Sequence, residues 1–243
     1  MTPQSVLVTG ASRGIGKEIA RGFAEAGAAR IAIGYLRNDA AAEQAAEELR
    51  GLGAEPVLVR GNIASTRVAD EIAGLGPLDA VVHAAATGVI RPALETTDKH
   101  FDWTMAANAR AFLSLARAAA PQMQPGSSLV AISSLGSVRV LENYVLVGTS
   151  KAALEALVRY LAVELAPQGI RVNAVSGGVV ETDALDHFPN REQMVSRSLE
   201  RTPAGRLVEA RDISDAVAFL CSPGAEMIRG QTLVVDGGFS LCV

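Results

Sequence analysis

Short apolar runs rich in Val, Ile and Leu alternate with longer amphipathic segments along the whole chain, and this alternation constrains the fold most strongly. Because the runs are apolar almost continuously, they are typical of strands in a parallel sheet that is covered on both faces. The segments between them, such as residues 15–26 and 39–52, have the periodicity of helices. The pattern predicts a doubly wound α/β fold, with one seven-stranded parallel sheet, helices on both faces and ligands at the carboxyl ends of the strands. The predicted strands are residues 6–9, 31–34, 56–60, 80–84, 128–133, 171–176 and 232–236.

The 243 residues suffice for one well-buried α/β domain, and no linker, repeat or charged block divides them, so residues 1–243 are expected to form a single domain. No signal-peptide pattern is present, and no apolar stretch is long enough to span a membrane. The cysteines, Cys221 and Cys242, and the three histidines show no metal-ligand spacing. A net charge of −4 argues against nucleic-acid binding. We expect a soluble cytoplasmic protein without a metal, a membrane partner or a nucleic-acid partner.

A glycine-rich stretch, Thr9-Gly10-Ala11-Ser12-Arg13-Gly14-Ile15-Gly16, follows the first predicted strand and opens the first predicted helix. Glycines here let the backbone turn tightly and approach a pyrophosphate, whose charge then lies at the helix N-terminus. A glycine cluster alone is compatible with an ordinary tight turn, but its place between strand and helix favours a Rossmann-type dinucleotide site. The predicted cofactor contacts in this stretch are Gly10, Ser12, Arg13, Gly14, Ile15 and Gly16.

The end of the second predicted strand indicates which dinucleotide binds. An acidic residue there would accept hydrogen bonds from the adenosine ribose of NAD. The chain instead reads Gly-Tyr-Leu-Arg, with no carboxylate before Asp39. Arg13 and Arg37 offer guanidinium groups that match a 2′-phosphate, so the sequence favours NADPH. The alternative is that Arg37 is an ordinary exposed loop residue. Asn62 and Ile63, after the third strand, are predicted to border the adenine.

A second group of functional side chains follows the fifth predicted strand. Ser134, Tyr144 and Lys151 supply a hydroxyl, a phenol and an ammonium in an order that suits reduction of a carbonyl or enoyl group. Tyr144 precedes Lys151 by seven residues, while the position four before the lysine is Val147. Both spacings put the two side chains on one helix face, because four residues turn about 400° and seven about 700°. If the helix extends back to Tyr144, the longer spacing moves the phenol about one turn further from the ammonium.

These residues and the glycine motif resemble the short-chain dehydrogenase/reductase superfamily, from the glycine motif to Asp236-Gly237-Gly238. In that superfamily the tyrosine of a Tyr-x-x-x-Lys pattern acts as the acid, assisted by an upstream serine and by an asparagine on the preceding helix. Lys151 matches the family lysine, Asn108 matches the asparagine, and Ser134 lies in the serine region. Val147 stands where the family tyrosine is usual.

That departure has a resemblance of its own. A tyrosine separated from the lysine by six residues is the pattern of the enoyl-thioester reductase branch, and residues 133–151 resemble bacterial enoyl-acyl-carrier-protein reductase III. Residues 173–178, 182–185 and 187–191 do so as well. The resemblance implies NADPH-dependent reduction of the C2=C3 double bond of a trans-2-enoyl thioester. The acyl group would be linked to acyl carrier protein or to CoA, in fatty-acid or polyketide-type biosynthesis.

The implied mechanism assigns a role to each of these residues. When hydride reaches Cβ, negative charge develops on the thioester oxygen, which Tyr144 is expected to hydrogen-bond. Lys151 would hold the nicotinamide ribose and supply positive charge while a proton reaches Cα. Ser134 is expected to be a second donor or a support for Tyr144, with a structural hydrogen bond at the strand end as the alternative. Asn108 is expected to support its helix.

The sequence departs from the family pattern elsewhere too. The family's Asn-Asn-Ala-Gly after the fourth strand is replaced here by a run that begins with His83. His83 is expected to support the strand end, with a ring nitrogen placed near the cofactor as the alternative. Gly177 replaces a loop proline after the sixth strand. The resemblance still implies that the Val180 backbone and the Thr182 hydroxyl hold the nicotinamide carboxamide. Residues 62–79 leave little room for a full helix, so a truncated or irregular connection is expected.

Residues 183–205 form a long insertion that is expected to be a substrate lid. Residues 190–206 contain four arginines and two glutamates, a local charge of +2. Such a charge suits a phosphopantetheine arm, CoA or an acidic carrier-protein surface. An ordinary solvated helix face is the alternative.

Two other functions remain open from the sequence alone. The first is a carbonyl reductase of the same fold, in which Tyr144 reaches the usual site through an irregular helix start. The second is a non-catalytic NADP-binding protein, suggested by the missing tyrosine at position 147. The family resemblance implies a four-helix seam, formed by the helices around residues 98–120 and 151–165, in a homodimer or homotetramer. Both segments are Ala/Leu-rich on more than one face, which suits such a seam.

Overall fold

All seven strands form one parallel sheet in the order β3-β2-β1-β4-β5-β6-β7, as the apolar runs predict. The computed structural model describes residues 2–63, 65–181, 185 and 191–242. The order reverses between β1 and β4, which places a topological switch point at their carboxyl ends, where ligands bind in doubly wound sheets. The strands are β1 (Ser5–Thr9), β2 (Arg30–Tyr35), β3 (Glu55–Arg60), β4 (Leu78–His83), β5 (Met123–Ser134), β6 (Arg171–Gly177) and β7 (Thr232–Val235).

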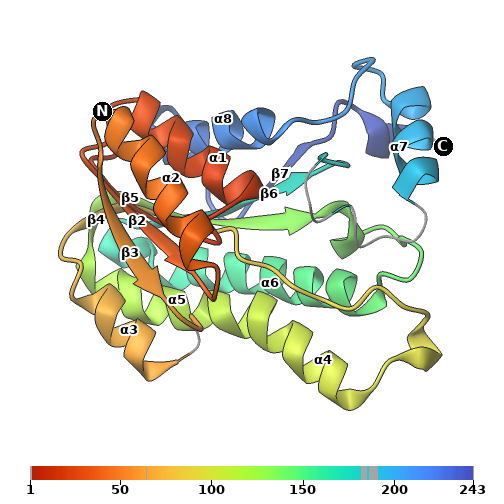
Figure 1. Cartoon of the computed structure of the whole chain (residues 1–243), viewed down its shortest axis with the longest axis horizontal. Helices are drawn as coiled ribbons and strands as arrows, with labels where there is room; N and C mark the ends of the chain where they lie inside the picture. The colour runs from red at the N-terminus through yellow and green to blue at the C-terminus, as the bar shows by residue number, and fades with distance from the viewer. Residues whose placement is uncertain (1, 64, 182–184, 186–190, 243) are drawn as a thin grey trace.

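Helices cover both faces of the sheet (Figure 1). One face carries α1 (Gly14–Glu25), α2 (Asp39–Gly51) and α8 (Ala210–Cys221), and the other carries α3 (Thr66–Ala73), α4 (Asp98–Met105), α5 (Ala111–Ala119) and α6 (Val145–Glu164). A further helix, α7 (Arg191–Arg201), lies beside the C-terminal end of the chain. A π-helical segment, Ala106–Arg110, joins α4 to α5.

The alternation of side chains along β1 shows how the sheet divides the core in two. Val6 and Val8 are buried against α1, α2 and α8, where Ile19, Phe23 and Ile213 join the same apolar cluster. Successive side chains of a strand point to opposite faces. Leu7 therefore lies in the other cluster, with apolar residues of α3, α5 and α6. Burial on both faces explains why the strands read as continuous apolar runs.

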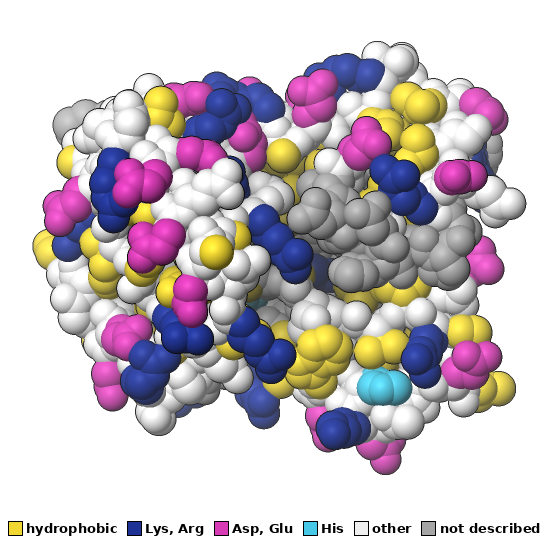
Figure 2. All heavy atoms as spheres, viewed as in Figure 1, with side chains coloured by type: hydrophobic (Ala, Val, Ile, Leu, Met, Phe, Trp, Pro, Cys, Tyr) yellow, Lys and Arg dark blue, Asp and Glu magenta, His cyan; other side chains and the backbone are white. Residues whose placement is uncertain are grey.

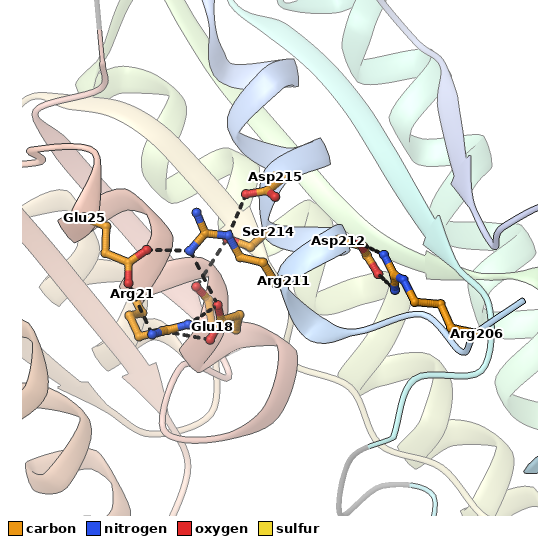
Figure 3. A network of polar contacts seen from close by, with 8 residues as sticks. All are labelled: Glu18, Arg21, Glu25, Arg206, Arg211, Asp212, Ser214 and Asp215. Carbon is orange, nitrogen blue, oxygen red and sulfur yellow. Dashed lines mark hydrogen bonds and ion pairs between the residues drawn. The ribbon is translucent and has the colours of Figure 1, made fainter. Parts of the chain in front are cut away.

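Charged side chains join α1 to α8 on the surface of the first layer (Figure 3). Arg211 of α8 pairs with Glu25 of α1 and with Asp215 one turn further along α8. Arg21 pairs with Glu18 on α1, and the hydroxyl of Ser214 donates to the Glu18 carbonyl at 3.3 Å. These pairs are partly exposed, so the apolar cluster beneath them contributes most of the packing energy.

Two connections differ from regular βα units. The segment after β3 contains only α3, a helix of eight residues, which agrees with the truncated connection expected there. β5 begins at Met123, five residues before the predicted start, and the register with β4 shifts between Leu78 and Ala80. Gly126, with φ 94°, interrupts the apolar pattern in this first part of β5, so the sequence did not indicate a strand. Among the described helices, none is long and apolar enough to cross a membrane.

Candidate active site

The glycine-rich loop turns sharply between β1 and α1. Gly10 and Gly14 have φ values of 72° and 55°, a left-handed conformation that glycine adopts without steric cost. Gly10 also lies against Ala85 in the loop after β4, where a β-carbon would be 2.8 Å from the Ala85 backbone. Gly16 in the first turn of α1 lies directly against the Gly10 carbonyl. The loop therefore needs glycine at each of these positions to be this compact.

The N-terminus of α1 has the features of an anion site. Arg13 is the N-cap residue, and its side chain makes no capping hydrogen bond. The first turn of α1 contains no acidic residue. The first backbone N–H groups of a helix have no partner within the helix, and they carry its positive dipole end. The loop thus fits a pyrophosphate, and Ser12, which is partly buried beside Arg13, lies at the same turn.

The end of β2 carries the groups that distinguish NAD from NADP. Asp39, the first carboxylate after the strand, pairs with Arg60 at the end of β3 at 3.2 Å. Burial raises the pKa of Tyr35, and the nearby Asp39 carboxylate acts in the same direction. Arg37 is exposed in the loop between them. Asp39 is therefore already paired with Arg60.

The remaining predicted cofactor contacts lie around the same edge of the sheet. Asn62 is exposed and Ile63 partly buried directly after β3. Ile15 in the first turn of α1 packs against the core. Val180 pairs with Val208 in an isolated parallel bridge after β6. Thr182 lies outside the described residues, as do residues 183, 184 and 186–190 of the expected lid.

Tyr144 lies directly before α6 rather than on it. The residue is the N-cap of α6, with φ −106° and ψ 12°, and its carbonyl accepts the first helical hydrogen bond from Gly148 N at 2.8 Å. Asn143, the residue before it, has a φ of 59°. The helix extension that the sequence left open therefore stops one residue short of Tyr144, because the left-handed conformation of Asn143 is not helical.

The phenol of Tyr144 lies in a close-fitting place beside the end of β5. Its hydroxyl donates to Ser134 Oγ at 3.4 Å. A β-carbon on Gly136 would lie 2.6 Å from two carbons of the tyrosine ring, and one on Gly148 would lie 2.6 Å from the Gly136 carbonyl. Burial raises the pKa of Tyr144, and the hydrogen bond with Ser134 acts against this rise. Tyr144 is therefore a neutral donor.

Lys151 is buried in the second turn of α6. Its ammonium donates to the carbonyl of Ile132 in β5 at 2.7 Å, and 4% of the residue is exposed. Burial lowers the pKa of Lys151 to about 8, and the Glu155 carboxylate acts in the opposite direction. Ser134, Tyr144 and Lys151 are thus brought together at the carboxyl end of β5.

Val147 fills the place where the family tyrosine is usual. It is buried, and its side chain lies directly against the backbone of Gly88 in the loop after β4. An apolar contact therefore replaces the acid at this position.

His83 joins the nucleotide loop to the catalytic helices. It is fully buried at the end of β4, with Nε2 3.2 Å from the Asn108 carbonyl and Nδ1 3.0 Å from Thr9 Oγ1. Because a carbonyl can only accept, Nε2 carries the proton and Nδ1 accepts from Thr9, whose hydroxyl in turn accepts from Ala85 N. Burial and the nearby Lys151 charge lower the pKa of His83 to about 3. His83 is thus a neutral supporting residue, as the sequence indicates.

Asn108 lies in the π-helical segment between α4 and α5. Its amide exchanges two hydrogen bonds with the backbone of Thr87, both at 2.9 Å, and also donates to Ser150 Oγ at 2.8 Å. Ser150 in turn donates to the Val147 carbonyl at 2.7 Å. Asn108 therefore holds the loop after β4 against α6, which is a supporting role.

Sequence reasoning missed the residues that support this site. Glu155 reads as an ordinary charged helix residue, and Ser133 as part of a strand. Gly136 and Gly88 are two of many loop glycines. Of these residues, only Glu155 could have been identified from the sequence. It follows Lys151 by four residues and so shares its buried helix face.

The space-filling view shows a hollow at the carboxyl ends of the strands, with Lys and Arg side chains along one side of it (Figure 2). A dinucleotide extending from α1 to Lys151 would cross this region, because the glycine loop and the candidate residues around Ser134 lie at carboxyl ends of strands of one sheet.

Comparisons with known proteins agree with this architecture. Residues 10–240 match the family model described as enoyl-(acyl carrier protein) reductase. The chain is 40% identical over 245 residues to 1-cyclohexenylcarbonyl-CoA reductase of Streptomyces collinus, covering 98% of this chain and 87% of that protein.

Two solved structures share the whole fold. A 7α-hydroxysteroid dehydrogenase in complex with NADH and 7-oxo glycochenodeoxycholic acid has a TM-score of 0.88 and 34% identity, over 97% of this chain and 93% of that one. L-sorbose reductase from Gluconobacter frateurii, in complex with NADPH and L-sorbose, has a TM-score of 0.89 and 26% identity, over 100% of this chain and 98% of that one.

The fold and the site are those of an oxidoreductase with a Rossmann-type sheet. The chain belongs to the short-chain dehydrogenase/reductase superfamily, in the family described as enoyl-(acyl carrier protein) reductase.

Proposed function

We propose that the protein reduces the C2=C3 double bond of a trans-2-enoyl thioester with NADPH. The observation that carries the proposal is the position of the phenol: Tyr144 lies before α6, beside Ser134, while Val147 fills the usual tyrosine position with an apolar contact. The 40% identity to a 1-cyclohexenylcarbonyl-CoA reductase supports the same reaction.

The side chains have distinct roles in this reaction. NADPH, when bound, supplies the hydride. Tyr144, a neutral phenol because burial raises its pKa, donates a hydrogen bond to the thioester oxygen as that oxygen gains negative charge. Ser134 orients the Tyr144 hydroxyl through their hydrogen bond. Lys151 supplies a positive charge beside the nicotinamide ribose, and a proton added at Cα completes the reduction.

NADPH is proposed over NADH because of the charges at the end of β2. The Asp39 carboxylate pairs with Arg60, so it is a poorer acceptor for ribose hydroxyls. Arg37 is exposed in the same loop, and Arg13, also exposed, is the N-cap residue of α1 at the glycine-rich turn. These guanidinium groups match a 2′-phosphate. We further propose that Asn62 and Ile63 border the adenine and that Val180 and Thr182 hold the carboxamide.

We propose CoA rather than acyl carrier protein as the usual carrier. Three of the four arginines in residues 190–206 have partners within the chain: Arg191 pairs with Glu181, Arg201 donates to the Cys242 carbonyl, and Arg206 pairs with Asp212. Their charge is therefore partly neutralised, which weakens the case for an acidic protein partner. Residues 183–205, including α7, remain our proposed lid.

The protein is also proposed to be a homodimer or homotetramer. Large apolar side chains are exposed on the helices of the expected seam: Phe101 and Trp103 on α4, and Tyr160 and Val163 on α6. Light scattering that gives a monomer of 25.2 kDa would contradict this proposal.

A carbonyl reductase is the second candidate. The hydroxyls of Tyr144 and Ser134 lie 3.4 Å apart, so both could donate to one ketone oxygen. The two structural relatives named above are a hydroxysteroid dehydrogenase and a sorbose reductase.

The test measures NADPH oxidation with crotonyl-CoA, 1-cyclohexenylcarbonyl-CoA and acetoacetyl-CoA offered separately. We expect turnover with an enoyl thioester, and a loss of about 100-fold or more in Tyr144→Phe. Tyr160→Phe is the matched control, because Tyr160 is an exposed tyrosine on α6 and should retain full activity. Turnover of acetoacetyl-CoA alone would select the carbonyl reductase. NADPH binding without turnover of any substrate would contradict the proposed reaction.

A further inference from the structure

Glu155 is a buried carboxylate one helical turn after Lys151. Only 7% of the residue is exposed, and it lies on the same inward face of α6 as the lysine. Burying a carboxylate is unfavourable unless hydrogen bonds and an opposite charge compensate it. The proposed reaction gives this residue no role.

Glu155 and Lys151 are held by consecutive residues of β5. The Ile132 carbonyl accepts from Lys151 Nζ at 2.7 Å, and Ser133 Oγ donates to Glu155 Oε1 at 2.5 Å. All four residues are buried. The carboxylate and the ammonium are therefore fixed against one short piece of the sheet, in an interior where water screens their attraction little.

The other groups that face Lys151 are uncharged or lie at the surface. His83 on β4 is neutral, because its pKa is lowered to about 3, and the Tyr144 phenol is neutral as well. β5 contributes the uncharged Ile132 and Ser133. Three other elements packed against α6 carry charged or titratable residues. On α4 these are Asp98, Lys99, His100 and Asp102, of which only His100 is partly buried. The π-helical segment contributes the exposed Arg110, and β6 begins with Arg171, which donates to the Ser222 carbonyl.

Among the described residues, Glu155 is thus the carboxylate whose charge acts on the buried lysine. We propose that Glu155 is a positioning residue that keeps Lys151 protonated and directed at the cofactor, acting through the charge of its buried carboxylate one helical turn away on α6. The proposal rests on the role of Lys151 in the proposed function.

The sign of the effect follows from the charges. A positive lysine is favoured below its pKa and is lost as the pH rises through it. Removing the Glu155 charge destabilises the Lys151 ammonium, so Lys151 should lose its proton at a lower pH. Cofactor affinity should fall together with the charge, because NADPH is an anion.

The experiment measures the affinity for NADPH by fluorescence titration between pH 6 and 10, which requires no turnover of any substrate. In the wild type, affinity should fall as the pH passes about 8, where Lys151 loses its proton. In Glu155→Gln the fall should begin about one pH unit lower. The amide can still accept from Ser133, so this variant removes the charge and keeps the shape. Glu164→Gln, at the exposed end of the same helix, is the matched control and should follow the wild type.

Two further variants keep the proposal testable if Glu155→Gln does not fold. Ser133→Ala removes the hydrogen bond but not the charges, and Glu155→Asp keeps a carboxylate at the position. In both variants the affinity for NADPH should begin to fall within about 0.3 pH units of the wild-type value. A Glu155→Gln profile that superimposes on the wild type would overturn the proposal, as would a Glu155→Asp profile shifted as far as that of Glu155→Gln. Failure to reduce enoyl thioesters would contradict the proposed function and leave this binding result standing.

Discussion

The ring of Tyr144 lies against the backbone of Gly136, so close that a β-carbon there would be 2.6 Å from two ring carbons. This contact determines where the phenol is. Tyr144 belongs to no regular helix, and its hydroxyl reaches Ser134 from the loop before α6. A glycine without a functional side chain is therefore part of the reason why the Tyr144 phenol lies beside Ser134.

Gly136→Ala should displace the Tyr144 ring and lower kcat about 100-fold, because a misplacement of about 1 Å has this effect on catalysis. Its φ is not left-handed, so the chain should still fold. Steady-state kinetics with the enoyl substrate and a thermal melt test both points. Gly51→Ala, at the end of α2 where no atom lies within 4 Å of an added β-carbon, is the matched control. Normal activity in Gly136→Ala would show that the contact does not position the ring.

Asn143 forms the left-handed turn directly before Tyr144, the N-cap residue of α6. Its φ of 59° suits asparagine or glycine, while a β-branched residue is strained there. Asn143→Val should lower the free energy of unfolding by about 1–2 kcal/mol and reduce kcat, whereas Asn143→Gly should keep both close to wild type. Urea unfolding and kinetics provide the measurement. Equal effects of Val and Gly would mean that the left-handed conformation is not what matters.

His83 should make the stability depend on pH. Its pKa is about 3 in the folded protein and near the ordinary value of 6.5 in the unfolded chain, so the unfolded state binds more protons between these values. The contribution of neutral His83 to the free energy of unfolding is fully present above pH 6.5 and is lost as the pH falls toward 3. His83→Gln should therefore lose less stability than the wild type between pH 7 and pH 5 in urea unfolding. His100→Gln, a change in a histidine of α4, should behave like the wild type; an identical acid dependence in all three would refute the linkage.

The ion pairs between α1 and α8 are conspicuous in Figure 3 but should matter little for stability. Arg211→Ala should barely change the midpoint of urea unfolding, because the pairs are solvated. Ile213→Ala, two residues along the same helix, should cost about 2–5 kcal/mol, because this side chain is fully buried. A larger effect of Arg211→Ala than of Ile213→Ala would contradict this ranking. The ranking should stay the same when unfolding is measured at high salt.

The fold was predictable because its signals are periodic. Runs such as residues 31–34 are apolar throughout, since both faces of the sheet are covered, and their order with the helices leaves few alternatives. Lys151 and the glycine loop were predictable because their chemistry depends on neighbours close in sequence.

The exact place of Tyr144 was not predictable in this way. It depends on a left-handed turn at Asn143, a conformation that the residue type permits but does not require. It also depends on a contact with Gly136 that exists only after folding. The hydrogen bond between Ser133 and Glu155 joins a strand to a helix, so no local sequence pattern predicts it. The same is true of His83, whose partners Thr9 and Asn108 come from distant parts of the chain.

The most direct test of the proposed reaction follows the hydride itself. NADPH carrying deuterium at C4 of the nicotinamide, in each of its two stereochemical forms, is incubated with the protein and crotonyl-CoA, and the product is examined by NMR. We predict butanoyl-CoA with deuterium at C3 from one of the two forms, and a much smaller yield with Tyr144→Phe. The account would be contradicted if crotonyl-CoA remained unchanged while acetoacetyl-CoA gained deuterium on the carbon that bears a new hydroxyl group.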